Sequence, residues 1–258
     1  MAASSPHAGW FGKLPSLGDF AQRRLPPEFV EFWDDWLGAE LSRVRIRHDA
    51  YWLQAYLASP VWRFVLLPGA LTPAAPAWAG VLMPSVDKVG RYFPLTLAHE
   101  IGTVPEQMKD VDALLAWLHD LDDVAADALQ EDWSLDTLEQ VLAAKAAPVP
   151  APFDPEGTVF DIHADWAGAA AGMTSLSDAC DDLRVNGGPG LLMAAPPRGE
   201  IARVLALQAA QVRRGMGLWW CDAPGDSRVL LSRGLPTHRL FDTLFGLDDG
   251  RDLQTETS

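Results

Sequence analysis

Two apolar runs separated by a charged loop constrain this chain most, because they predict a strand, a turn and a second strand. The first run covers 78–83 and is stopped by Pro84, and the second covers 92–97. Both are rich in aromatic and aliphatic residues that favour strands. The hairpin therefore holds the polar side chains of Ser85, Asp87, Lys88 and Arg91 at a tip between two buried strands, with Gly90 for the turn.

The rest of the chain alternates between short apolar runs and amphipathic segments. Short connections between the runs 61–67, 78–83 and 92–99 predict an antiparallel meander. Apolar residues at steps of three and four predict helices. We expect helices over 26–43 and 52–57, from 105 onward, from 134 onward and over 236–245, and further strands from 10, over 158–162, 191–193, 218–221 and 229–231.

The length of 258 residues permits one large domain, or one domain and a smaller one. The best candidate boundary is a proline-rich stretch, which is semi-rigid and extended. We expect an N-terminal core over 1–147, a linker over 148–156, a C-terminal part over 157–247 that packs on the same sheet, and a disordered tail over 248–258.

The net charge of −15 and the isoelectric point near 4.6 disfavour nucleic acid and anionic membrane surfaces as partners. Two cysteines, Cys180 and Cys221, are too few for a disulfide framework and indicate a reducing cytosol. The most apolar region, 58–84, contains Arg63 and five prolines, so we expect no insertion into a membrane.

Catalytic motifs are absent from the sequence. There is no Gly-x-Ser-x-Gly elbow, and Gly12-Lys13 is followed by Leu14 rather than the Ser or Thr of a P-loop. Asp161, His163 and Asp165 would share one face of a strand, but a metal site needs further ligands, and a polar strand end facing water is the simpler interpretation. Glycines 187, 188 and 190 indicate a turn. We expect no cofactor and no metal.

The loop after the first strand carries charges that match those of the hairpin tip. Asp19 and Arg24 lie in or beside this loop, and Asp87 and Arg91 lie in the tip. These groups either converge into a charged cleft that binds a ligand, or pair with each other and pin the two loops together. With Lys13 and Ser85 they form the candidate site. The first fifth of the chain also carries a basic group, which could either bind an anion or a partner or form a solvated face with local salt bridges: Arg23, Arg24, Arg43, Arg45 and Arg47.

Several long segments of this chain are unusual in composition. They are Trp-Phe-Gly-Lys-Leu-Pro-Ser-Leu-Gly-Asp-Phe at 10–20, Arg-Leu-Pro at 24–26, Ser-Pro-Val-Trp-Arg-Phe at 59–64, the hairpin at 80–96, Leu-Trp-Trp at 218–220 and Arg-Gly-Leu-Pro at 233–236. Together these segments resemble the TagF (ImpM) family of type VI secretion accessory proteins. The resemblance is dense over 9–97, thin over 98–216, and returns over 217–245.

This resemblance implies a cytoplasmic protein that is not an enzyme and that represses the secretion system after translation. The implied partner is a cytoplasmic component of the system, its forkhead-associated scaffold protein. The implied fold is of the α+β type: a central, mostly antiparallel sheet flanked by helices on both faces, an α/β/α sandwich. Two alternatives stay open, a module that senses a small ligand or a phospho-group through loops 13–24 and 85–91, and an unrecognised hydrolase.

Overall fold

The computed structural model describes residues 6–17, 19–104, 108–148, 190–194, 201, 205, 214–222 and 227–247. The strands of these residues form one sheet in the order β2-β1-β5-β4-β3-β7-β8-β6, and all neighbours are antiparallel. The strands are β1 (Gly9–Gly12), β2 (Ala21–Arg23), β3 (Trp62–Leu66), β4 (Ala77–Met83), β5 (Leu95–Gly102), β6 (Gly190–Ala194), β7 (Met216–Cys221) and β8 (Arg228–Arg233).

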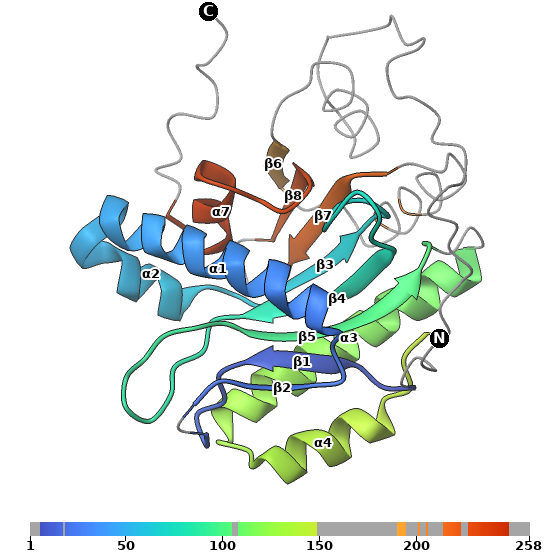
Figure 1. Cartoon of the computed structure of the whole chain (residues 1–258), viewed down its shortest axis with the longest axis horizontal. Helices are drawn as coiled ribbons and strands as arrows, with labels where there is room; N and C mark the ends of the chain where they lie inside the picture. The colour runs from blue at the N-terminus through green and yellow to red at the C-terminus, as the bar shows by residue number, and fades with distance from the viewer. Residues whose placement is uncertain are drawn as a thin grey trace, which may run out of the picture.

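Helices cover both faces of this sheet (Figure 1). One face carries α1 (Pro27–His48), the short η1 (Asp49–Tyr51), α2 (Trp52–Ala58) and α7 (Arg239–Leu244). The other face carries α3 (Met108–Gln130) and α4 (Leu135–Ala144). The expected α/β/α sandwich of the α+β type is therefore confirmed.

Alternate side chains of β3 pack into the two hydrophobic layers on opposite faces of the sheet. Trp62, Phe64 and Leu66 pack into the cluster under α1. Val65 and Leu67 pack on the opposite side, under α3. Because both faces are covered, the strand reads as a nearly continuous apolar run, interrupted by Arg63, rather than as an alternating one.

The layer under α1 is built largely from aromatic rings. Trp33 lies at its centre, with ring centroids 4.8 Å from Trp36, 5.1 Å from Phe64 and 6.1 Å from Trp219. Its indole Nε1 donates a hydrogen bond of 2.8 Å to Thr96 Oγ1, so the polar edge of the buried ring is satisfied. The aromatic stripe of α1 is thereby fixed against the middle of the sheet.

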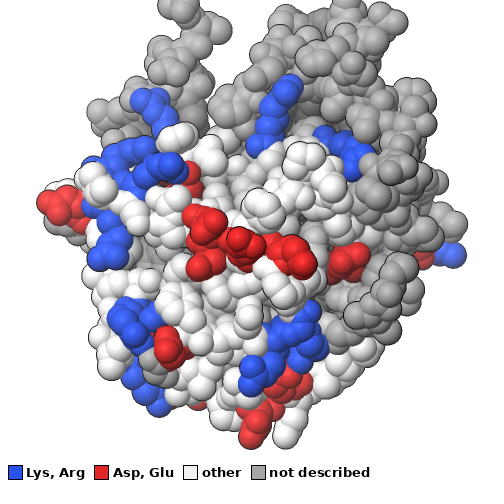
Figure 2. Space-filling model, viewed as in Figure 1, with Lys and Arg blue, Asp and Glu red and all other residues white. Residues whose placement is uncertain are grey.

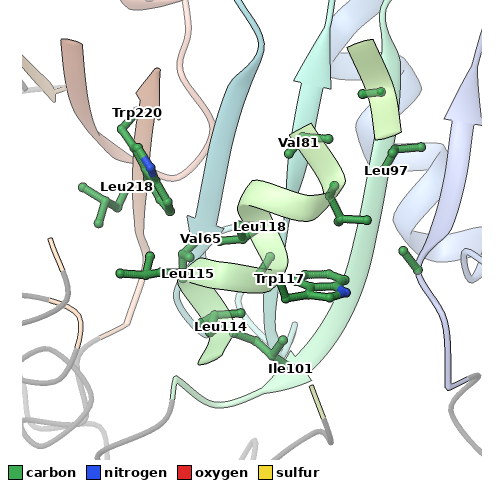
Figure 3. Close-up of a cluster of buried hydrophobic side chains, with 14 of the residues drawn as sticks. Val65, Val81, Leu97, Ile101, Leu114, Leu115, Trp117, Leu118, Leu218 and Trp220 are labelled. Atoms are coloured by element: carbon green, nitrogen blue, oxygen red, sulfur yellow. The ribbon is translucent and has the colours of Figure 1, made fainter. Parts of the chain in front are cut away.

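The layer under α3 is mainly aliphatic (Figure 3). Leu114, Leu115 and Leu118 of α3 lie against the sheet, where they meet side chains such as Val65. One histidine belongs to this layer: His99 of β5 is 5% exposed, and its ring centroid is 6.1 Å from that of Trp117. The layer therefore contains a buried ionisable side chain.

The meander β3-β4-β5 confirms the expected antiparallel arrangement of the hairpin, with one change of boundary. The second hairpin strand begins at Leu95 rather than at Tyr92, which makes only an isolated bridge with Val86. Pro94 has no N–H to give to a ladder, so regular pairing starts after it. Similarly, α1 continues beyond Arg43 to His48, since basic residues in its last turn favour a helix C-terminus.

The strands β7 and β8 complete the sheet beyond β3, and β6 forms its far edge. The short strand β2 pairs with β1 at the other edge and was not expected, because its polar sequence carries no strand pattern. Several expectations fall outside the described residues: the strand over 158–162, the group Asp161, His163 and Asp165, glycines 187 and 188, residues 149–156 of the linker, and the tail.

Candidate functional site

The two charged loops meet at a buried ion pair between Lys13 and Asp87. Lys13 directly follows β1, and its Nζ lies 2.6 Å from Asp87 Oδ2. The two side chains are 2% and 0% exposed. Gly12 makes this approach possible, since its φ is +130° and a Cβ there would lie 2.1 Å from the carbonyl oxygen of Pro94. The end of β1 therefore fits tightly against the loop that precedes β5.

Asp87 also organises its own loop. Its Oδ1 accepts hydrogen bonds from the backbone N–H groups of Val89 (3.1 Å) and Arg91 (2.9 Å), while Oδ2 accepts one from Arg91 Nε (2.7 Å). Burial acts to raise the pKa of Asp87, but the hydrogen bonds from Lys13, Arg91 and Val89 outweigh it and hold this pKa well below its usual range. The carboxylate is thus charged and satisfied on both oxygens.

Ser85 ties the same two loops together through the backbone. Its Oγ donates to the carbonyl oxygen of Lys13 at 2.7 Å. The hydroxyl of Tyr56 donates to the Ser85 carbonyl and accepts from the Ser85 N–H, both at 3.0 Å. Burial raises the pKa of Tyr56, against a smaller lowering by its bond to Ser85, so the phenol stays protonated. The helix α2 is thereby linked to the hairpin loop.

An aromatic cover lies over the lysine. The ring centroid of Phe20 is 4.7 Å from Lys13 Nζ and 4.7 Å from the ring centroid of Phe93. The ring of Phe11 contacts both, with its centroid 5.6 Å from that of Phe93 and 6.2 Å from that of Phe20. A cation held against an aromatic face and shielded from water is stabilised by the ring quadrupole. The core of the candidate site is therefore closed by side chains of this chain.

Arg24 and Asp19 lie outside this cluster. Arg24 donates from Nε and Nη2 to the carbonyl oxygen of Ala8, at 3.0 and 2.8 Å, and its Nη1 pairs with Glu139 of α4. Glu139 also accepts a hydrogen bond of 2.6 Å from Trp10 Nε1. Asp19 Oδ1 accepts from the N–H of Phe20 at 2.8 Å, and among the described residues it takes part in none of the ion pairs.

The structure thus brings together Lys13, Ser85, Asp87 and Arg91 and places Asp19 and Arg24 elsewhere.

The ion pair between Arg24 and Glu139 is a second link between distant segments. Burial acts to raise the pKa of Glu139, but the hydrogen bonds from Arg24 and Trp10 outweigh this effect, so the net shift of the pKa is downward. This second ion pair joins the β1–β2 corner to α4. The sequence carries no local signal for it, because Arg24 and Glu139 are 115 positions apart.

A third charged group surrounds Arg63 of β3 and was not foreseen. Arg63 Nη2 lies 2.5 Å from Asp122 Oδ2 and 3.2 Å from His119 Nδ1, and its Nη1 pairs with Asp222. Burial raises the pKa of Asp122, and the nearby charge of Arg63 partly offsets this. The sequence did contain a sign of this group: Arg63 lies in the middle of the apolar run 61–67, and a buried arginine requires charged or polar partners.

Two general properties follow from the described part of the chain. Among its residues there is no group of three or more His, Cys, Asp or Glu side chains that could hold a metal ion. None of its helices has the length and hydropathy needed to cross a membrane.

The fold and the site define an α+β sandwich whose charged loops are tied together by a buried ion pair. The family model of the TagF N-terminal domain, described as type VI secretion system-associated, matches residues 9–145. The chain therefore belongs to the TagF family and is a type VI secretion system-associated protein, as the resemblance of its motifs had indicated.

One solved structure extends this likeness to nearly the whole chain. The crystal structure of PA0076 from Pseudomonas aeruginosa PAO1 is 29% identical in sequence and matches with a TM-score of 0.63. The match covers 92% of this chain and 93% of that one. No curated protein matches this sequence significantly.

Proposed function

We propose that this protein represses the assembly of a type VI secretion system after translation, by binding a cytoplasmic forkhead-associated scaffold component. The match to the TagF N-terminal domain over 9–145 carries the proposal. In this proposal the protein is not an enzyme and acts in the cytoplasm. Its partners are then protein components of the secretion machine.

The arrangement of the two loops supports a role in presenting a surface to a protein. Lys13 and Asp87 are buried and paired, whereas the outer side of the same loop is open: Val89 is 70% exposed, and the side chain of Arg91 is 50% exposed. A rigid base with an exposed apolar residue beside a cation is suited to protein contacts. We infer that the buried ion pair braces the loop and that Val89 and Arg91 form part of the contact surface.

Purified components test this proposal directly. Pull-down and calorimetry against the cytoplasmic components should identify the forkhead-associated scaffold as the binder. Val89→Asp should weaken that binding roughly tenfold or more, since a charge would be buried in the contact. Leu57→Asp is the matched control, because Leu57 is a 53% exposed apolar residue on α2. Absence of binding to every component, with secretion unchanged on overproduction, would refute the proposal.

The alternative is a charged cleft in loops 13–24 and 85–91 that senses a small ligand or a phospho-group. The burial and pairing of Lys13 and Asp87 make it the weaker proposal, because a ligand would have to displace an existing partner. A thermal-shift screen with nucleotides, phosphopeptides and metal ions distinguishes the two. A ligand at 100 times its Kd should stabilise the fold by about 2.7 kcal/mol.

A further inference from the structure

The outward face of α1 has a composition unlike that of an ordinary solvated helix. Exposed residues recur along it at steps of four and three: Glu28, Phe32, Asp35, Ala39, Ser42 and Ile46. Phe32 is 48% exposed and Ile46 is 85% exposed, although both are large apolar side chains. The spacing is that of a helix seam that packs against another helix.

Charge is divided along the same helix. Its first half carries Glu28, Glu31, Asp34 and Asp35, and its second half carries Arg43, Arg45 and Arg47. Figure 2 shows a row of acidic side chains over α1 and basic side chains gathered toward its C-terminal end. The helix dipole favours this polarity only in the first and last turns, and here the acidic residues continue into the third.

The acidic half lacks compensation within the described part of the chain. None of the ion pairs formed there involves any of the four carboxylates. Partial burial, and then the neighbouring charge of Asp35, raise the pKa of Asp34. This half of the helix would therefore be stabilised by an approaching positive surface.

Three pairs of positions on this helix are complementary when its sequence is reversed about Ala39. Phe32 lies seven residues before Ala39, and Ile46 lies seven residues after it. Asp35 and Arg43 are each four residues from Ala39 on opposite sides, and Glu31 and Arg47 are each eight residues away. An isologous two-fold contact requires this relation, since residue i must meet residue j and j must meet i.

We propose that α1 is the interface of a homodimer, in which two copies pack this helix antiparallel about a two-fold axis at Ala39. Phe32 of each copy then meets Ile46 of the other, and Asp35 meets Arg43 of the other. Gly38 and Ala39 carry little side-chain bulk, so the helices approach closely at the axis. A basic partner protein would match the acidic half. A second copy does so too, because it offers Arg43 and Arg47, which pair with Glu40 and Asp242 in their own chain. This proposal is independent of the proposed function.

The contact is small, so the dimer is expected to be weak. One pair of helices buries less than the ~1,200 Å² at the lower limit of stable interfaces. Sedimentation of the full chain should therefore show a monomer–dimer equilibrium, with a Kd of roughly 10 μM to 1 mM. High salt should weaken it, because the outer contacts are ion pairs. A monomer at every concentration up to about 1 mM overturns the proposal.

Cysteine cross-linking tests the axis and the antiparallel direction. In a Cys180→Ser background, with Cys221 buried, Ala39→Cys should oxidise to a disulfide-linked dimer. Phe32→Cys and Ile46→Cys should each fail alone, since two copies of either position lie roughly 21 Å apart along the helices. An equal mixture of those two variants should cross-link. Gln140→Cys on α4 is the control, and cross-linking of Ala39→Cys no faster than this control overturns the proposal.

Charge reversal provides a second, independent test. Asp35→Arg places like charges opposite each other at two points and should raise the dimer Kd at least tenfold, whereas Asp112→Arg on the opposite layer should leave it unchanged. Mixing Asp35→Arg with Arg43→Asp should restore a heterodimer, because both pairs become complementary again. Arg43 also pairs with the buried Glu40, so circular dichroism must first confirm that Arg43→Asp is folded. If Asp35→Arg leaves the dimer Kd unchanged, the dimer uses another face and the proposal is overturned.

Discussion

Lys13 and Asp87 illustrate how a buried charge is tolerated only while all of its partners remain. Asp87 faces two cations and two backbone N–H groups, and Lys13 has Asp87 and the ring of Phe20. The pair joins segments 74 positions apart. Without the Asp87 carboxylate, the buried Lys13 ammonium has no ionic partner. Without the Lys13 ammonium, the carboxylate still has Arg91 and two backbone N–H groups. The two changes should therefore have unequal effects.

We expect Lys13→Met to lower the free energy of unfolding by about 1–3 kcal/mol, since one partner of a buried hydrogen bond is lost. Asp87→Asn should lower it further. Lys88→Met is the control: Lys88 pairs with Asp132 at 3.4 Å, both side chains are more than half exposed, and its loss should change stability by less than about 0.5 kcal/mol. Urea unfolding measures all three. Equal losses for the two buried substitutions would contradict the bracing role of Asp87.

His99 should make stability depend on pH in a defined window. Burial, the largest effect, and repulsion by His7 lower the pKa of His99 to about 4, despite an opposing hydrogen bond to the Pro148 backbone. The unfolded chain has a histidine pKa near 6.5 and so binds the proton first. Stability is therefore full above about pH 6.5 and falls as the pH drops toward the folded pKa.

The expected loss from this histidine is about 3 kcal/mol between pH 6.5 and 4. Thermal unfolding at half-unit pH steps measures it. His99→Gln should remove most of that slope, whereas replacing the exposed His238 with Gln should leave it in place. A slope identical in both variants would show that other groups cause it.

At the scale of elements, α4 depends on its N-cap. Ser134 Oγ accepts a hydrogen bond of 3.1 Å from the N–H of Thr137, and α4 then positions Glu139 against Arg24 and Trp10. Ser134→Ala should cost about 1 kcal/mol, while Ser134→Asp should retain the cap and most of the stability. Chemical unfolding measures the difference. If alanine and aspartate behave alike, the cap contributes nothing.

Individual helices and strands are predicted from the sequence where a local pattern defines them. The hairpin, the aromatic stripe of α1 and the helix starting after Ser134 follow from local periodicity and capping, and all three are present. Pairings across long stretches do not follow. The partner of Arg24 lies on a helix 115 positions away, and β3 pairs on one side with β4, as expected, but on its other side with the distant strand β7. Such contacts depend on tertiary packing, which local patterns do not encode.

For the whole molecule, the sheet order binds the two ends of the chain into one unit. The strand β7 pairs with β3 along its edge, and Trp33 packs against Trp219 of β7 as well as Phe64 of β3. The family match ends at residue 145, before β7 begins. A protein consisting of 1–147 alone would leave β3 as an open edge and remove part of the aromatic layer.

We therefore expect the fragment 1–147 to aggregate or to lack a cooperative unfolding transition. Coexpression with 148–258 should restore a folded complex, because the missing strand and rings return. Solubility and near-ultraviolet circular dichroism of the tryptophans provide the measurements. A stable, cooperative fragment 1–147 would show that the family region folds on its own.

The position of β7 beside β3 also has a consequence for how the protein is made. β3 ends at Leu66 and β7 starts at Met216, so a ribosome that has finished the first strand must still add about 150 residues before its neighbour exists. At roughly 5–20 residues per second, that delay is about 8–30 s. During this time the nascent chain carries an unpaired strand of large apolar side chains. Its yield in the cell should therefore depend on chaperones that bind at the exit tunnel.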